Sequence, residues 1–158
     1  MADLYRRNAG IVVFNRRGQV LLCKRNDVAD SWQFPQGGIE NGESVAQAAL
    51  RELKEETSLH NVVLVKSLTT PARYTFPPQI IAKMQQRGFK NVGQDIYWSL
   101  VYFDGEDDEI NLQTAEPEFC EWQWSDFATA CELIVDFKKE AYAKAQAEFS
   151  PLIADYRP

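Results

Sequence analysis

Three glutamates, Glu52, Glu55 and Glu56, occupy positions i, i+3 and i+4 of a segment rich in helix-forming residues. On an α-helix those positions share one face, with Cβ atoms about 5–6 Å apart. Each pair of carboxylates at that spacing repels by roughly 3 kcal/mol at an effective dielectric of about 20. A divalent cation removes this repulsion, and Mg²⁺ prefers carboxylate oxygens together with water and substrate phosphate oxygens. The spacing therefore indicates either a metal-binding face or a solvated acidic face.

The segment around these glutamates predicts a glycine-bearing loop followed by an amphipathic helix. The loop spans residues 37–42, and Ser44 with Gln47 three residues later is a capping-box signal for a helix start. Residues 45–56 are mostly good helix formers, and their apolar positions repeat along one face. The acidic face would therefore stand on a helix held against a core by its opposite face.

The wider pattern over residues 37–59 resembles the Nudix box, the signature of the Nudix hydrolase family. The matching positions are Gly37, Glu43, Arg51, Glu52, Leu53, Glu55, Glu56 and Leu59. Rough residue frequencies give a chance match of about one in a million for a chain of this length. Ser58 departs from the pattern, which has glycine there. Because the end of a helix favours a positive φ, serine at this position should cost about 1 kcal/mol.

Nudix enzymes are αβα sandwiches that split pyrophosphate linkages with Mg²⁺ or Mn²⁺. The resemblance therefore implies one α+β domain over residues 1–158, with a mixed sheet flanked by the box helix and a C-terminal helix. It assigns the metal to the helix glutamates Glu52, Glu55 and Glu56, with the Gly37 carbonyl as a further ligand. It also implies that Glu43 pairs with Arg51 and steadies the junction between loop and helix.

Outside the box, the chain resembles one subgroup, the bacterial RNA pyrophosphohydrolases and the asymmetrically cleaving dinucleoside tetraphosphate hydrolases. The match includes residues 32–38, Gly93-Gln94, residues 109–114, Pro117-Glu118-Phe119 and Phe137-Lys138. The resemblance makes Glu118 a further metal ligand and the general base. It implies polyphosphate contacts by Arg6, Arg25 and Lys138, and stacking of a base on Phe137. Tyr74 is open equally to a contact at the rim of the site and to packing in the core.

The remaining elements must position these residues. Apolar, β-branched runs at 10–14 and 19–24, joined by a turn at 15–18, predict a hairpin. Further strands are expected over 61–68, 96–103 and 119–124, and a closing helix over 137–149. The segment 71–93, which contains Pro77-Pro78, receives no assignment.

Composition limits the class of protein. The chain has 158 residues and a net charge of −6, with no apolar run near the ~20 residues of a membrane span and no secretory leader. Cys23, Cys120 and Cys131 form no metal-type pair and suit reduced thiols, buried as small hydrophobes, in a cytoplasm. The acidic balance disfavours a protein that coats DNA or RNA by charge alone. It leaves open an enzyme that meets phosphate through a metal ion.

These observations predict a metal-dependent pyrophosphohydrolase of nucleoside 5′-polyphosphates, monomeric and cytoplasmic. The first expected substrate is the 5′-triphosphate end of RNA, converted to a 5′-monophosphate. The alternative substrate is diadenosine tetraphosphate, cleaved asymmetrically to ATP and AMP. A catalytically silent ligand-binding regulator of the same fold is a third possibility, although such a protein would be expected to lose the metal glutamates.

Overall fold

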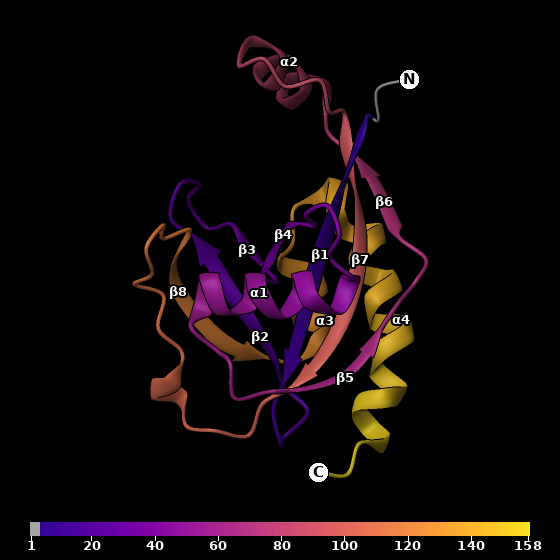
Figure 1. The fold of residues 1–158 in the computed structure, drawn as a ribbon. Helices are drawn as coiled ribbons and strands as arrows, with labels where there is room; N and C mark the ends of the chain where they lie inside the picture. The colour runs from indigo at the N-terminus through magenta and orange to yellow at the C-terminus, as the bar shows by residue number, and fades with distance from the viewer. Residues whose placement is uncertain (1–3) are drawn as a thin grey trace.

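The computed structural model describes residues 4–158 and shows a β-sheet with helices on both faces (Figure 1). The strands are β1 (Tyr5–Phe14), β2 (Val20–Arg25), β3 (Trp32–Gln33), β4 (Gln36–Gly38), β5 (Val63–Ser67), β6 (Ala72–Thr75), β7 (Gly93–Tyr102) and β8 (Phe119–Ser125). The helices are α1 (Val45–Thr57), α2 (Pro78–Gln86), α3 (Phe127–Leu133) and α4 (Lys139–Asp155), with 3₁₀ turns η1 (Asp107–Glu109) and η2 (Asp136–Lys138).

The sheet is mixed, as expected. β1 and β7 run parallel along their whole length, and every other pairing is antiparallel, in the order β3-β2-β1-β7-β5 with β4 on β1, β6 on β7 and β8 on β2. Because successive side chains of a strand point to opposite faces, β1 contributes residues to two hydrophobic cores, one on each face of the sheet. Ile11 and Val13 join the core under α1, whereas Val12 and Phe14 join the core under α3 and α4. The αβα sandwich is therefore confirmed.

Helix α1 begins and ends as the sequence predicts. The Ser44 hydroxyl accepts from the Gln47 amide while the Gln47 side chain accepts from the Ser44 amide, which completes the capping box. The helix ends at Ser58 with φ of 70°, the left-handed conformation that favours glycine. The Ser58 hydroxyl donates to the carbonyl of Asn111 at 2.8 Å, a contact that glycine cannot make.

Several expectations need correction. The predicted hairpin holds only beside its turn, since β1 and β2 pair at Phe14↔Val20 and then diverge to other neighbours. The closing helix begins at Lys139, because residues 136–138 form the 3₁₀ turn η2. Cys120 is exposed rather than buried, since its position on β8 faces away from the core.

The unassigned segment contains β6 and α2. Proline stands at the first turn of α2, where its missing N–H needs no partner. No residue of α2 is buried, and the helix projects from one end of the sandwich, close to the start of β1 and β7 (Figure 1). None of the helices in residues 4–158 combines the length and apolar character needed to cross a membrane.

Candidate active site

A pocket of about 600 Å³ lies beside α2, whose Ile80 and Met84 help to line it. Most of the residues predicted for the site line it: Arg6, Arg25, Gly37, Glu52, Glu56, Tyr74, Glu118, Phe137 and Lys138. The other three, Glu43, Arg51 and Glu55, lie beside its acidic wall. Residues separated by more than a hundred positions in the sequence thus share one cavity.

The acidic wall consists of Glu52 and Glu56 from α1 and Glu118 from the loop before β8. Burial, with repulsion from Glu118 and Glu52, raises the pKa of Glu56 to about 10. Burial also raises the pKa of Glu52, although the Arg51 guanidinium opposes this. The Glu56 Oε2 atom is buried and has no hydrogen-bond partner among residues 4–158. A cation would remove this cost, so the donor set fits a hard divalent metal such as Mg²⁺ or Mn²⁺.

Gly37 lies against this wall. It pairs with Ala9 of β1, and a Cβ atom at Gly37 would collide with the Glu52 carboxylate. A side chain at this position would therefore displace the Glu52 carboxylate from its present place in the pocket.

Arg51 joins the loop to the helix. Its Nε and Nη2 atoms donate to the two carboxylate oxygens of Glu43 at 2.7 and 2.8 Å, and Nη2 also donates to the Gly38 carbonyl at 2.9 Å. Its Nη1 atom donates to Glu52 at 2.8 Å and to Glu55 at 3.2 Å. Hydrogen bonding to Arg51 lowers the pKa of Glu43 to about 2. The expected pairing of Glu43 with Arg51 is present.

The three helix glutamates do not form one cluster. The Glu55 side chain is 59% exposed, turns toward Arg51 and does not line the pocket. Within residues 4–158, no three acidic, histidine or cysteine side chains are gathered tightly enough to ligate one ion. The position of Glu55 has a local cause, because the Arg51 guanidinium forms ion pairs with both Glu52 and Glu55.

Basic side chains also line the pocket. The Arg6 guanidinium lies over Gly38, where a Cβ atom would collide with it. Arg25 is engaged by Asp27 through two hydrogen bonds of 2.8 and 2.6 Å, a partner that sequence reasoning did not anticipate. Lys138 is only 7% exposed, and burial together with the charge of Arg25 lowers its pKa to about 8. Arg6 and Lys138 thus bring cationic groups to the pocket.

An aromatic cluster lies beside Lys138. The ring of Tyr74 lies 5.6 Å from that of Phe137 and 5.9 Å from that of Phe76, and the Lys138 ammonium lies 5.6 Å from the Tyr74 ring. Tyr74 is 5% exposed, so both alternatives considered for it apply: it packs in the core and also lines the pocket. Phe137 is partly buried, and its ring borders the pocket.

Sequence reasoning missed several lining residues. Ile80 and Met84 reach the pocket from α2, and their i, i+4 spacing after Pro77-Pro78 was the available signal. Asn8 lines the pocket with a buried Nδ2 atom that has no partner among the described residues. An isolated asparagine in a strand carries no such signal.

The NUDIX domain family model matches residues 4–152. The chain belongs to the Nudix family. Among curated proteins, it is 40% identical over 152 residues to the RNA pyrophosphohydrolase of Sphingopyxis alaskensis, covering 94% of this chain and 95% of that protein. It is 39% identical over 150 residues to Nudix hydrolase 26, chloroplastic, of Arabidopsis thaliana, covering 92% of this chain and 69% of that protein.

Solved structures share the Nudix fold. The E. coli dihydroneopterin triphosphate pyrophosphohydrolase aligns with a TM-score of 0.66 at 20% identity, over 90% of this chain and 97% of that one. The C. elegans Ap4A hydrolase in a binary complex aligns with a TM-score of 0.66 at 18% identity, over 92% of this chain and 98% of that one. At these identities the likeness establishes the fold alone.

Proposed function

We propose that this Nudix hydrolase removes pyrophosphate from the 5′-triphosphate end of RNA and leaves a 5′-monophosphate. The supporting observation is a single pocket lined by carboxylates, cationic side chains and aromatic rings. Relatives at 37–40% identity over more than 90% of this chain carry the name RNA pyrophosphohydrolase. The proposed enzyme acts as a monomer. The three free cysteines suit a reducing cytoplasm.

Glu52, Glu56 and Glu118 would hold Mg²⁺ or Mn²⁺, with Glu55 and the Gly37 carbonyl as the remaining candidate ligands. When bound, the metal neutralises phosphoryl oxygens and lowers the pKa of the attacking water. Glu43 and Arg51 act by positioning, because Arg51 contacts both Glu52 and Glu55.

The remaining steps belong to the side chains. Arg6 and Lys138 pair with phosphate oxygens. Arg25 also pairs with a phosphate oxygen while its guanidinium keeps its contact with Asp27. Phe137 stacks on a base. Glu118 accepts a proton from water, whose oxygen forms a bond to phosphorus while the bridging P–O bond breaks and pyrophosphate leaves with the electron pair.

Diadenosine tetraphosphate is the alternative substrate, favoured by the net charge of −6. The test is competitive: both substrates are given together with Mg²⁺, and their kcat/KM values are compared. We expect triphosphorylated RNA to be preferred. A higher kcat/KM for diadenosine tetraphosphate would make that compound, and not RNA, the substrate. If neither is cleaved while a nucleotide sugar or an oxidised deoxynucleoside triphosphate is, the proposal fails. A silent regulator would hydrolyse none of them.

A further inference from the structure

Positive charge gathers at the end of the sheet nearest α2. No acidic residue occurs between Glu56 and Asp95, although the chain as a whole is acidic. The basic residues of β6, α2 and the loop that follows α2 are Arg73, Lys83, Arg87 and Lys90. The start of β1, with Arg6 and Arg7, lies at the same end, because Tyr5 pairs with Gly93 and Gly93 pairs with Thr75.

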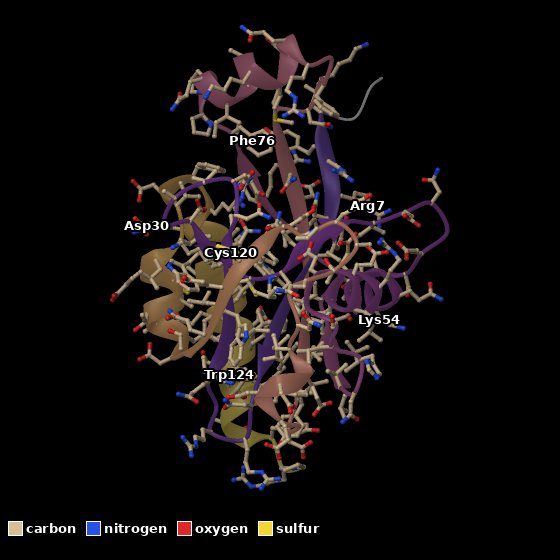
Figure 2. All side chains as sticks on the ribbon, turned by 90° about the vertical axis from the view of Figure 1, so that its left-hand side faces the viewer. Arg7, Asp30, Lys54, Phe76, Cys120 and Trp124 are labelled. Atoms are coloured by element: carbon tan, nitrogen blue, oxygen red, sulfur yellow. The ribbon has the colours of Figure 1, made fainter. Side chains whose placement is uncertain are left out.

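One face of α2 mixes aliphatic and basic side chains. Ile80, Lys83, Met84 and Arg87 follow the spacing i, i+3, i+4 and i+7, which places them along one side of a helix and its C-cap. Ile80 and Met84 line the pocket, whereas Lys83 and Arg87 are exposed beside them. Phe76 lies beneath the helix, between it and the sheet (Figure 2). The pocket therefore continues onto a basic, partly apolar surface.

We infer that α2, with its C-cap Arg87 and the loop that follows, is a docking arm for the single-stranded RNA nucleotides that follow the 5′-triphosphate. This inference rests on the proposed function and adds the part of the substrate that lies outside the pocket. Each further nucleotide brings a phosphate, which pairs with lysine or arginine, and a base, whose face packs on apolar side chains. A dinucleoside polyphosphate has no phosphodiester chain to offer the arm. The arm thus favours RNA over the alternative substrate.

The test compares two triphosphorylated substrates, a dinucleotide and an unpaired octanucleotide, with Mg²⁺ present. The arm variant is Lys83→Gln/Arg87→Gln/Lys90→Gln. The matched control, Arg17→Gln/Lys144→Gln/Arg157→Gln, removes the same charge from exposed positions in the β1–β2 turn, α4 and the C-terminal residues. We expect kcat/KM of the arm variant to fall about tenfold or more for the octanucleotide and to stay within about twofold for the dinucleotide. The control should retain both values.

Salt provides a second readout. Each phosphate contact on a single strand contributes about −0.7 to the slope of log kcat/KM against log salt. Losing three contacts should therefore make this negative slope shallower by about 2 for the octanucleotide. Equal losses in arm and control variants, or equal losses on both substrates, would overturn the inference and leave the proposed function standing. A wild-type enzyme that releases no pyrophosphate from either RNA would overturn the proposed function, and the docking arm with it.

Discussion

Arg51 grips Glu43 through two parallel hydrogen bonds, at 2.7 and 2.8 Å, and contacts the candidate metal ligand Glu52 with its remaining Nη atom at 2.8 Å. Glu43 therefore acts on the candidate metal site indirectly, because it fixes the guanidinium that orients Glu52. Removing partners that lie behind metal ligands typically costs 10–100-fold in metal affinity or activity.

We therefore expect Glu43→Gln to raise the Mg²⁺ concentration needed for half-maximal activity by about tenfold or more, because a neutral amide cannot accept both bonds from Arg51. The measurement is a Mg²⁺ titration of the initial rate. Glu40→Gln, an exposed acid in the same loop, is the matched control and should titrate like the wild type. Identical titrations for Glu43→Gln and the wild type would contradict the positioning role.

Alanine substitutions at the two adjacent glycines of β4 should impair hydrolysis in different ways. A Cβ atom at Gly37 would displace the Glu52 carboxylate, whereas one at Gly38 would displace the Arg6 guanidinium. Both collisions are with the ends of side chains, so both alanine variants should fold. We expect Gly37→Ala to lower kcat about tenfold or more, and Gly38→Ala chiefly to raise KM for triphosphorylated RNA. Separate kcat and KM values decide this, and the same pattern in both variants would contradict it.

Ser58 offers a test of stability alone. Its left-handed conformation costs about 1 kcal/mol relative to glycine, and its hydrogen bond to Asn111 offsets about the same amount. Ser58→Ala keeps the strain and loses the bond, so its unfolding free energy should fall by about 1 kcal/mol. Ser58→Gly should stay near the wild type. Urea denaturation measures both, and a glycine variant destabilised as much as the alanine variant would contradict this balance.

Lys138 predicts a pH dependence. Burial lowers its pKa to about 8, so the folded protein loses this charge as the pH rises through that value. Its neighbour Tyr74 keeps its charge state there, since burial raises the pKa of Tyr74 to about 12. KM for triphosphorylated RNA should therefore rise above pH 8, by up to about tenfold at pH 9, because about a tenth of the molecules remain charged there.

The control is Lys138→Gln, whose KM should be higher at pH 7 and should lack this rise. Stability should change in the opposite direction to binding. Because the pKa of Lys138 is depressed in the folded state, the unfolded chain binds more protons than the folded one between pH 8 and 10.5. The free energy of unfolding therefore rises with pH across this window. Parallel pH profiles of KM for variant and wild type would exclude Lys138 from substrate binding.

The predictable parts of this fold follow from local signals. The capping residues of α1, its apolar face and the β-branched runs of β1 and β2 each act over a few residues, and they specify the elements that carry Glu52 and Glu56. The box pattern and the Pro-Glu-Phe motif further identified Glu118, which the fold brings to the same pocket.

The less predictable parts depend on the conformation of individual side chains and on tertiary contacts. Glu55 turns toward Arg51, one helical turn before it, and Arg25 pairs with Asp27, two residues after it; the spacing permits both pairs but equally permits contacts with a metal or a phosphate. Helix α2 has an apolar spacing at Ile80 and Met84 but buries none of its residues, so that spacing does not mark a helix packed on the core. Its role in the site emerges only when β6 and β7 place it over the pocket.

Glu56, with Glu52 and Glu118, is proposed to hold the metal that hydrolysis requires. The most direct measurement is kcat/KM for pyrophosphate release from triphosphorylated RNA by Glu56→Gln with Mg²⁺ present. Glutamine keeps the shape and replaces a carboxyl whose ionisation is opposed by burial and by Glu118 and Glu52, so the metal-free variant should unfold at the wild-type temperature or above it. We predict a loss of about 10²-fold or more with the fold intact. Near-normal hydrolysis by this variant would contradict the metal assignment.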